Sequence, residues 1–181
     1  MEYRKGRAAF APILIALALT APSIALASGP GGVDPHPVPA TVPGAKARLV
    51  HGEAIAPAGA PPAVQEVIAA ANKIRTKPYV WGGGHGHWAD RGYDCSGAVS
   101  FALHGGKLLS SPLDSTSLEA WGSPGTGSWI TIYANGGHAY AVIAGLRWDT
   151  ASRTGADGPR WYRSTKAAAS GPFTARHPTE Y

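Results

Sequence analysis

The sequence predicts an α+β fold, with N-terminal helices packed on a small antiparallel β-sheet. Residues 63–75 repeat apolar side chains at helical spacing, and residues 95–104 form a second helix-like run that stops at two glycines. From residue 128 the pattern changes to short alternating strands separated by glycine-containing turns. Helices followed by a run of strands are typical of this fold class.

The first 27 residues predict an export signal. Three basic residues precede an apolar run over residues 8–19, and Ala25-Leu26-Ala27 supplies the small residues that a signal peptidase requires. We therefore expect an extracytoplasmic chain that begins at Ser28 and has no stable membrane insertion. The alternative is an uncleaved anchor, but an anchor needs about 18 apolar residues and Pro12 interrupts this run.

Charge and composition argue against a nucleic-acid partner. The chain has 181 residues with 16 Lys and Arg and 11 Asp and Glu, and removal of the signal leaves 13 basic and 10 acidic residues. The remaining basic residues are scattered and form no dense run. We expect a single domain that is a monomer and binds no nucleic acid.

Composition also predicts the domain boundary. Residues 28–60 are rich in Gly, Pro and Ala, which is typical of a flexible or partly polyproline linker without a core. Residues 61–181 form the predicted domain, which begins with two prolines at the start of the helix 63–75. Apolar residues form one stripe along that helix: Val64, Val67, Ile68, Ala71 and Ile74.

Cys95 is the only cysteine and lies at the start of the second predicted helix, after the N-cap residue Asp94. Free backbone N–H groups and the positive end of the helix dipole stabilise a thiolate there and lower its pKa. A buried, inert cysteine is the alternative, since Cys95, Val99 and Ala102 share one helical face. An unpaired thiol in an exported protein is exposed to oxidation, however, and this favours a catalytic role.

The remaining elements follow from local patterns. Residues 79–81 are extended, and three glycines after them allow close backbone approach. Residues 107–121 predict loop and short helix. The predicted strands are residues 128–134, 137–144, 146–150 and 172–176, with turns at Asn135-Gly136 and Ala144-Gly145 and a polar segment over residues 151–159.

The register of the second hairpin predicts a base and its orienting group. A cysteine nucleophile needs a base, usually histidine, that a third polar group holds. With a two-residue loop at 144–145, Asp149 lies on the same face as His138 and diagonal to it, within hydrogen-bonding reach. A three-residue loop would instead bring Thr150 to that face. We prefer Asp149, because two-residue loops are commoner and a carboxylate orients histidine more strongly.

The other histidines give no metal site by pattern. His85 and His87 are two residues apart, but no cysteine or acidic residue at ligand spacing completes a zinc site, so we expect neither metal nor cofactor. His85 and Trp81 are instead candidates for the wall of a cleft beside the glycine-rich loop.

Three motifs in order resemble the NlpC-type cell-wall cysteine peptidases, a papain-like family. They are Tyr79-x-Trp81-Gly82-Gly83, Asp94-Cys95-Ser96-Gly97, and Gly137-His138 at the start of an apolar strand, within residues 63–150. Residues 111–122 and 145–150 look like an actinobacterial branch. The acidic residue that the family carries before the histidine strand is absent from residues 124–128.

The resemblance implies a papain-like fold with the nucleophile at a helix N-terminus. Cys95 would be the nucleophile, His138 the general base and Asp149 the third member. The hydroxyl of Tyr79 would lie near the nucleophile, and the backbone N–H of Cys95 would bind the oxyanion. The remaining candidates for substrate contacts are Ser96, Trp81, Gly83 and His85.

The implied activity is hydrolysis of an amide bond in peptidoglycan stem peptides, of the D-glutamyl endopeptidase type, by a secreted or wall-associated enzyme. An amidase or acyltransferase with the same residues is an alternative, as is a wall-binding module without turnover. Three arginines are candidates to pair with substrate carboxylates: Arg147, Arg160 and Arg176.

Overall fold

The computed structural model describes residues 41–152 and 155–181, within a compact unit that spans Pro37–Tyr181. The predicted signal peptide and residues 28–40 of the predicted linker lie outside the described residues. No helix in the described ranges is both long and apolar enough to cross a membrane.

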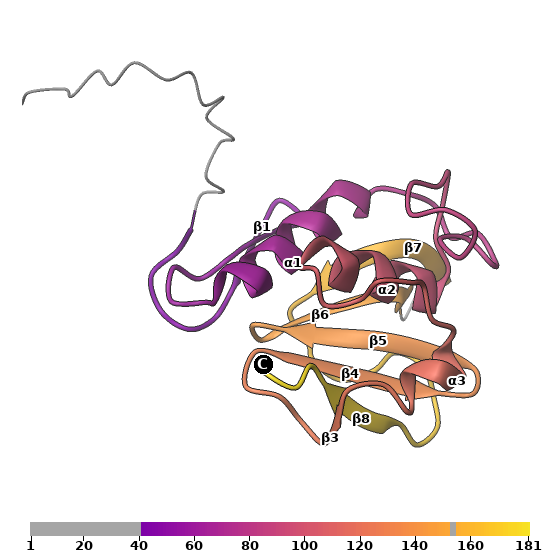
Figure 1. Ribbon diagram of the computed structural model, residues 1–181. Coiled ribbons are helices and arrows are strands. Elements are labelled where there is room, and N and C mark those ends of the chain that lie inside the picture. Colours follow the sequence, from indigo (N-terminus) through magenta and orange to yellow (C-terminus); the bar gives the residue numbers. More distant parts are fainter. Residues whose placement is uncertain (1–40, 153–154) are drawn as a thin grey trace, which may run out of the picture. The chain divides into compact units, whose positions relative to one another are not determined.

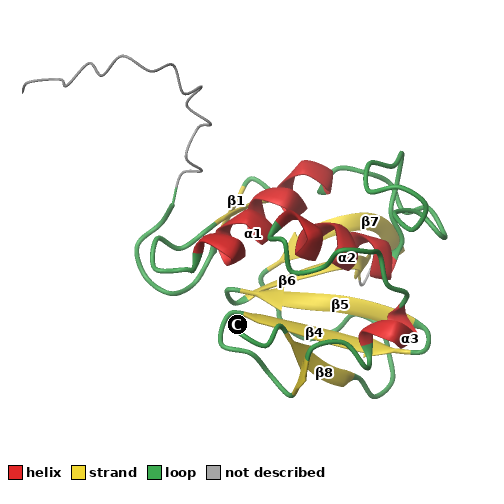
Figure 2. Ribbon diagram, viewed as in Figure 1, coloured by secondary structure: helices red, strands yellow, loops and turns green. Residues whose placement is uncertain are grey.

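The α+β prediction is confirmed (Figures 1 and 2). The helices are α1 (Pro62–Ile74), α2 (Cys95–Gly105) and α3 (Ser115–Leu118). A hairpin of β1 (Arg48–Val50) and β2 (Glu53–Ile55) precedes them. The main sheet contains β3 (Ser123–Pro124), β4 (Ile130–Asn135), β5 (His138–Ile143), β6 (Leu146–Ser152), β7 (Gly155–Tyr162) and β8 (Thr174–His177).

The main sheet is antiparallel, in the order β3-β8-β4-β5-β6-β7. Helices α1 and α2 pack side by side, and α2 lies against β5 and β6 (Figure 1). Alternation along the strands sends one set of side chains into the core with the helices. This set includes Ile130, Ile132, Ala141, Ile143 and Trp148.

Trp148 ties the sheet to the helix. Its side chain is fully buried, and its indole N–H donates a 3.0 Å hydrogen bond to the carbonyl oxygen of Ala98. A buried Trp N–H needs such a partner, since an unpaired donor in the core is costly. The bond lies one turn after Cys95 and therefore fixes the start of α2 relative to β6.

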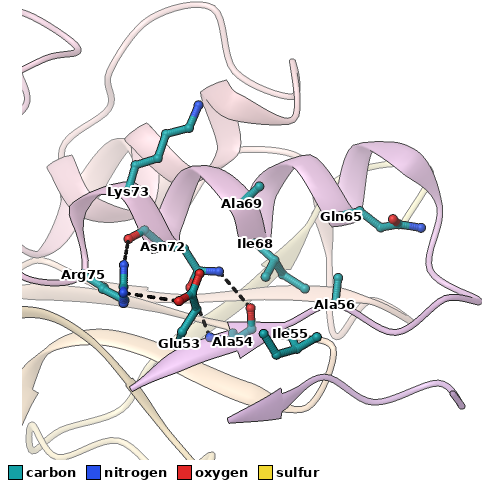
Figure 3. A pocket seen from close by; sticks show the side chains of 10 residues that line it. All are labelled: Glu53, Ala54, Ile55, Ala56, Gln65, Ile68, Ala69, Asn72, Lys73 and Arg75. Atoms are coloured by element: carbon teal, nitrogen blue, oxygen red, sulfur yellow. Dashed lines mark hydrogen bonds and ion pairs between the residues drawn. The ribbon is translucent and has the colours of Figure 1, made fainter. Parts of the chain in front are cut away.

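The prediction that residues 28–60 lack a core is wrong for the described part, residues 41–60. This segment forms β1 and β2, and its buried Ala54, Ala56 and Ala60 pack in the main core. The Asn72 side chain of α1 accepts from Ala54 N (3.1 Å) and donates to Ala54 O (2.8 Å), as Figure 3 shows. Alanine is common in linkers and also fills gaps under a helix. Composition therefore did not distinguish the two cases, and this explains the error.

Two strand boundaries also differ from prediction. The first hairpin loop is Gly136-Gly137 and not Asn135-Gly136, because Asn135 pairs with His138 and its side-chain oxygen accepts the N–H groups of Gly137 and His138. The segment predicted as a polar loop, residues 151–159, contains the end of β6 and much of β7. Its polar composition fits the position of β7, which is an edge strand of the sheet.

Candidate active site

Cys95 is the first residue of α2, as predicted. The Asp94 carboxylate caps the helix and accepts the N–H of Gly97 at 2.7 Å. The same carboxylate accepts the N–H of Gly82 at 3.1 Å, so it joins the glycine-rich loop to the start of the helix. The N–H of Gly97 is thus satisfied by the cap, whereas the helix itself supplies no partner for the N–H groups of its first residues, Cys95 and Ser96.

His138 and Asp149 are brought together by the predicted register. Ile143 pairs with Leu146, and the loop residues Ala144 and Gly145 both have positive φ (47° and 84°), as a two-residue type I′ turn requires. His138 Nε2 lies 2.9 Å from Asp149 Oδ1. Thr150 is buried at an irregularity in the pairing of β6 with β7, and Asp149 is the candidate that contacts His138.

The imidazole also reaches Cys95. The imidazole and the N–H of Ala139 lie close enough to the sulfur to act on it, and both favour the thiolate over the thiol. Because Asp149 occupies Nε2, the ring nitrogen left for the sulfur is Nδ1. The three side chains therefore form a chain of thiol, imidazole and carboxylate, in the order that nucleophilic catalysis uses.

The electrostatics favour a charged sulfur and a charged ring. Burial opposes ionisation of Cys95, but the hydrogen bond and charge of His138 outweigh it, so the pKa of the thiol falls below its ordinary value. Burial also opposes protonation of His138, yet the hydrogen bonds to Asp149 and Cys95 raise the pKa of the imidazole to about 9. Both shifts favour the form of the pair in which Cys95 is a thiolate and His138 an imidazolium.

Aromatic rings cover the imidazole. Phe173 lies edge-on to His138 (centroids 6.3 Å apart) and to Tyr140 (5.2 Å), and Tyr140 stacks on Tyr133 at 4.9 Å. The His138 side chain is 13% exposed and that of Asp149 is 0% exposed. Their hydrogen bond is thus largely protected from water, which strengthens it.

A pocket of about 420 Å³ opens beside Cys95. Among the predicted substrate-contact residues, Tyr79, Trp81, His85 and Ser96 line it, and Trp81 is 87% exposed at its edge. Burial, followed by the negative charges of Cys95 and Asp94, raises the pKa of the Tyr79 phenol, so its hydroxyl stays protonated. The pocket has the size and mixed polarity of a small peptide or ligand site.

Gly83 does not line this pocket. Its carbonyl oxygen accepts the N–H of Asp94 at 3.2 Å, and its Cα packs against Gly92. The role of Gly83 is therefore to support the helix start. Sequence reasoning missed four other lining residues: Asp114, Ser115, Gly136 and Gly137.

His85 contacts two polar side chains at the start of α2. Its Nε2 lies 3.0 Å from Asp94 Oδ1 and 3.2 Å from Ser96 Oγ, so it belongs to the polar wall of the pocket. His87 is exposed. Within residues 41–152 and 155–181, no group of three or more His, Cys, Asp or Glu side chains is arranged to hold a metal ion.

The three arginines do not face this pocket. Arg147 pairs with Asp149, Arg160 donates to the carbonyl oxygens of Arg75 and Lys77, and Arg176 donates to Glu119 O. The suggestion that they bind substrate carboxylates is thus unsupported. The alternation of side chains along β6 could have predicted that Arg147 lies beside Asp149. For Phe173, which covers the His138 ring, no local sequence signal predicts the position.

No protein-family model matches the chain, and no curated protein matches it.

Proposed function

We propose that this protein is an exported cysteine peptidase with a papain-like, NlpC-type architecture that hydrolyses an amide bond in peptidoglycan stem peptides. The observation that carries the proposal is the contact chain from Cys95 through His138 to Asp149. The order of the three sequence motifs supports the family and substrate, and the predicted signal peptide agrees with a substrate outside the cytoplasm.

The geometry supports acyl transfer through a thioester. The Cys95 thiolate attacks the amide carbonyl carbon. The oxyanion that forms accepts hydrogen bonds from N–H groups at the start of α2, including that of Cys95. The His138 imidazolium protonates the leaving amine as the C–N bond breaks. His138 then removes a proton from water, whose oxygen attacks the thioester, and the thiolate is regenerated.

Asp149 supports this cycle without touching substrate. Its bond to Nε2 fixes the ring orientation, so that Nδ1 faces the sulfur, and its charge stabilises the imidazolium. The pocket beside Cys95 accommodates the residues next to the cleaved bond. The motif resemblance favours the bond after D-glutamate.

Digestion of purified peptidoglycan tests the proposal. Mature protein should release fragments whose masses report one amide bond cut within the stem peptide, and Cys95→Ala should release none. Release of fragments with a new amide in place of the carboxyl group would favour an acyltransferase. Retention on peptidoglycan with no fragments, together with no labelling of Cys95 by a thiol-directed probe, would favour a binding module and overturn the proposal.

A further inference from the structure

A buried arginine lies beside the carboxylate of Asp149, two residues earlier on β6. Arg147 Nε is 3.2 Å from Asp149 Oδ2, and the two side chains are 6% and 0% exposed. The guanidinium also lies over the ring of Tyr162, 4.4 Å from its centroid, on the neighbouring strand β7. Arg147 is thus held from two sides.

The two carboxylate oxygens of Asp149 have different partners. Oδ1 accepts the His138 ring and the N–H of Ala151, both at 2.9 Å. Oδ2 has no hydrogen-bond partner among the described residues, and neither has Arg147 Nε. The ion pair with Arg147 is therefore the polar contact that compensates Oδ2 for its burial.

We propose that Arg147 is a positioning residue: it holds the Asp149 carboxylate turned so that Oδ1 faces His138. This inference rests on the proposed function, since it assigns Arg147 to the same site. A buried carboxylate without a nearby cation takes up a proton or turns toward another donor. Either change weakens the bond that orients the imidazole.

Charge balance around the site supports the assignment. Cys95 and His138 form one interacting pair, and Asp149 and Arg147 form a second pair behind it. Other titratable or charged groups lie around these two pairs. Asp94 and Tyr79 are near Cys95, and Tyr140 and Tyr162 are near Asp149 and Arg147. Asp157 and Arg160 are near Tyr162. Among them, Arg160 directs its guanidinium to backbone carbonyl oxygens.

The test is a double-mutant cycle with Arg147→Met and Asp149→Asn. In the wild-type background, Arg147→Met should lower kcat about tenfold to a hundredfold and change KM little, as loss of a group that orients a site residue does. It should also alter the pH dependence of Cys95 alkylation by iodoacetamide. Arg147→Lys should recover part of the loss. Arg163→Met, which removes an exposed arginine one residue after β7, is the control and should change neither readout.

In the Asp149→Asn background, Arg147→Met should cost no further activity, because its action passes through the carboxylate. An equal loss in both backgrounds, or an unchanged alkylation profile in Arg147→Met, would overturn the proposal. If Arg147→Met does not fold, the pH dependence of Cys95 alkylation is measured on Arg147→Lys and on the double variant instead. The double variant is suitable because it buries no unpaired charge. Alkylation needs no substrate, so a wild-type protein that fails to cut peptidoglycan while showing the expected alkylation shifts would refute only the proposed function.

Discussion

The Cα of Gly97 packs against the carbonyl oxygen of Gly83, so that a Cβ at position 97 would collide with that oxygen. The same oxygen accepts the N–H of Asp94. The glycine-rich loop therefore rests directly on the first turn of α2. This contact fixes the position of Cys95 relative to the part of the pocket wall that Tyr79 and Trp81 form.

Gly97→Ala should move the loop away from the helix. We expect a loss of about 1–3 kcal/mol in the free energy of unfolding, from overpacking against a backbone atom, and a fall in kcat/KM. Urea denaturation and peptidoglycan digestion measure the two effects. Gly86→Ala is the matched control, since an added Cβ there meets nothing within 4 Å and should change stability by less than about 0.5 kcal/mol. Equal stability of the two variants would contradict the packing argument.

Asp149→Asn should lower kcat by about 10²–10⁴-fold, because an amide orients the imidazole less well and stabilises the imidazolium less. Thr150→Val removes the hydroxyl of the neighbouring residue at nearly constant volume. Since Thr150 is buried and Asp149 makes the contact with His138, this variant should keep kcat within a few-fold of wild type. A larger loss in Thr150→Val than in Asp149→Asn would reverse the assignment of the third residue.

The activity should fall at alkaline pH as His138 loses its proton. The raised pKa of about 9 means that the ring is protonated below that pH and neutral above it, so the imidazolium that protonates the leaving amine disappears through pH 9. The acid side of the profile reports protonation of Cys95, whose pKa lies below its ordinary value. Measured from pH 5 to pH 10, kcat/KM should rise as Cys95 loses its proton, remain constant, and then fall as His138 loses its proton near pH 9. A decline centred near pH 6.5 would show that the site does not hold the imidazolium.

His138→Ala should reduce the alkylation rate of Cys95 at neutral pH. The hydrogen bond and charge of His138 lower the pKa of the thiol, so their removal leaves burial and Asp94 to raise it. The midpoint of the alkylation profile should therefore move to higher pH. His87→Ala, which removes an exposed histidine from the nearby loop, is the control. A midpoint that stays in place would mean that the helix start alone sets the reactivity of Cys95.

Asn72→Ala should destabilise the protein without changing the chemistry of the site. Asn72 bonds to both backbone groups of Ala54 and accepts the indole N–H of Trp161 at 2.9 Å. Its loss leaves these groups unpaired and should cost about 2–3 kcal/mol in the free energy of unfolding. Lys73→Ala, at the adjacent exposed position, should have little effect. Equal stability of the two variants would show that residues 41–60 contribute little to the domain.

The fold class, the helices α1 and α2 and the hairpin that carries His138 and Asp149 follow from local sequence. Helical periodicity, the Asp94 cap and a two-residue loop act over a few residues each, so the register that joins His138 to Asp149 can be worked out by counting. The same counting cannot bring Cys95 to His138. They are far apart in sequence, and their contact depends on the packing of α2 against the sheet.

Only the tertiary structure decided which small or polar residues enter the core and the site. Alanines at positions 54, 56 and 60 have the composition of a linker and become core because α1 covers them. Gly83, predicted to contact substrate, lies outside the lining of the pocket beside Cys95, and its carbonyl meets Gly97 in the first turn of α2. Arg147 becomes the partner of a buried carboxylate because water is excluded there. Each outcome depends on which surfaces meet in the folded chain. Burial changes the free energy of a side chain, and local sequence does not show which side chains become buried.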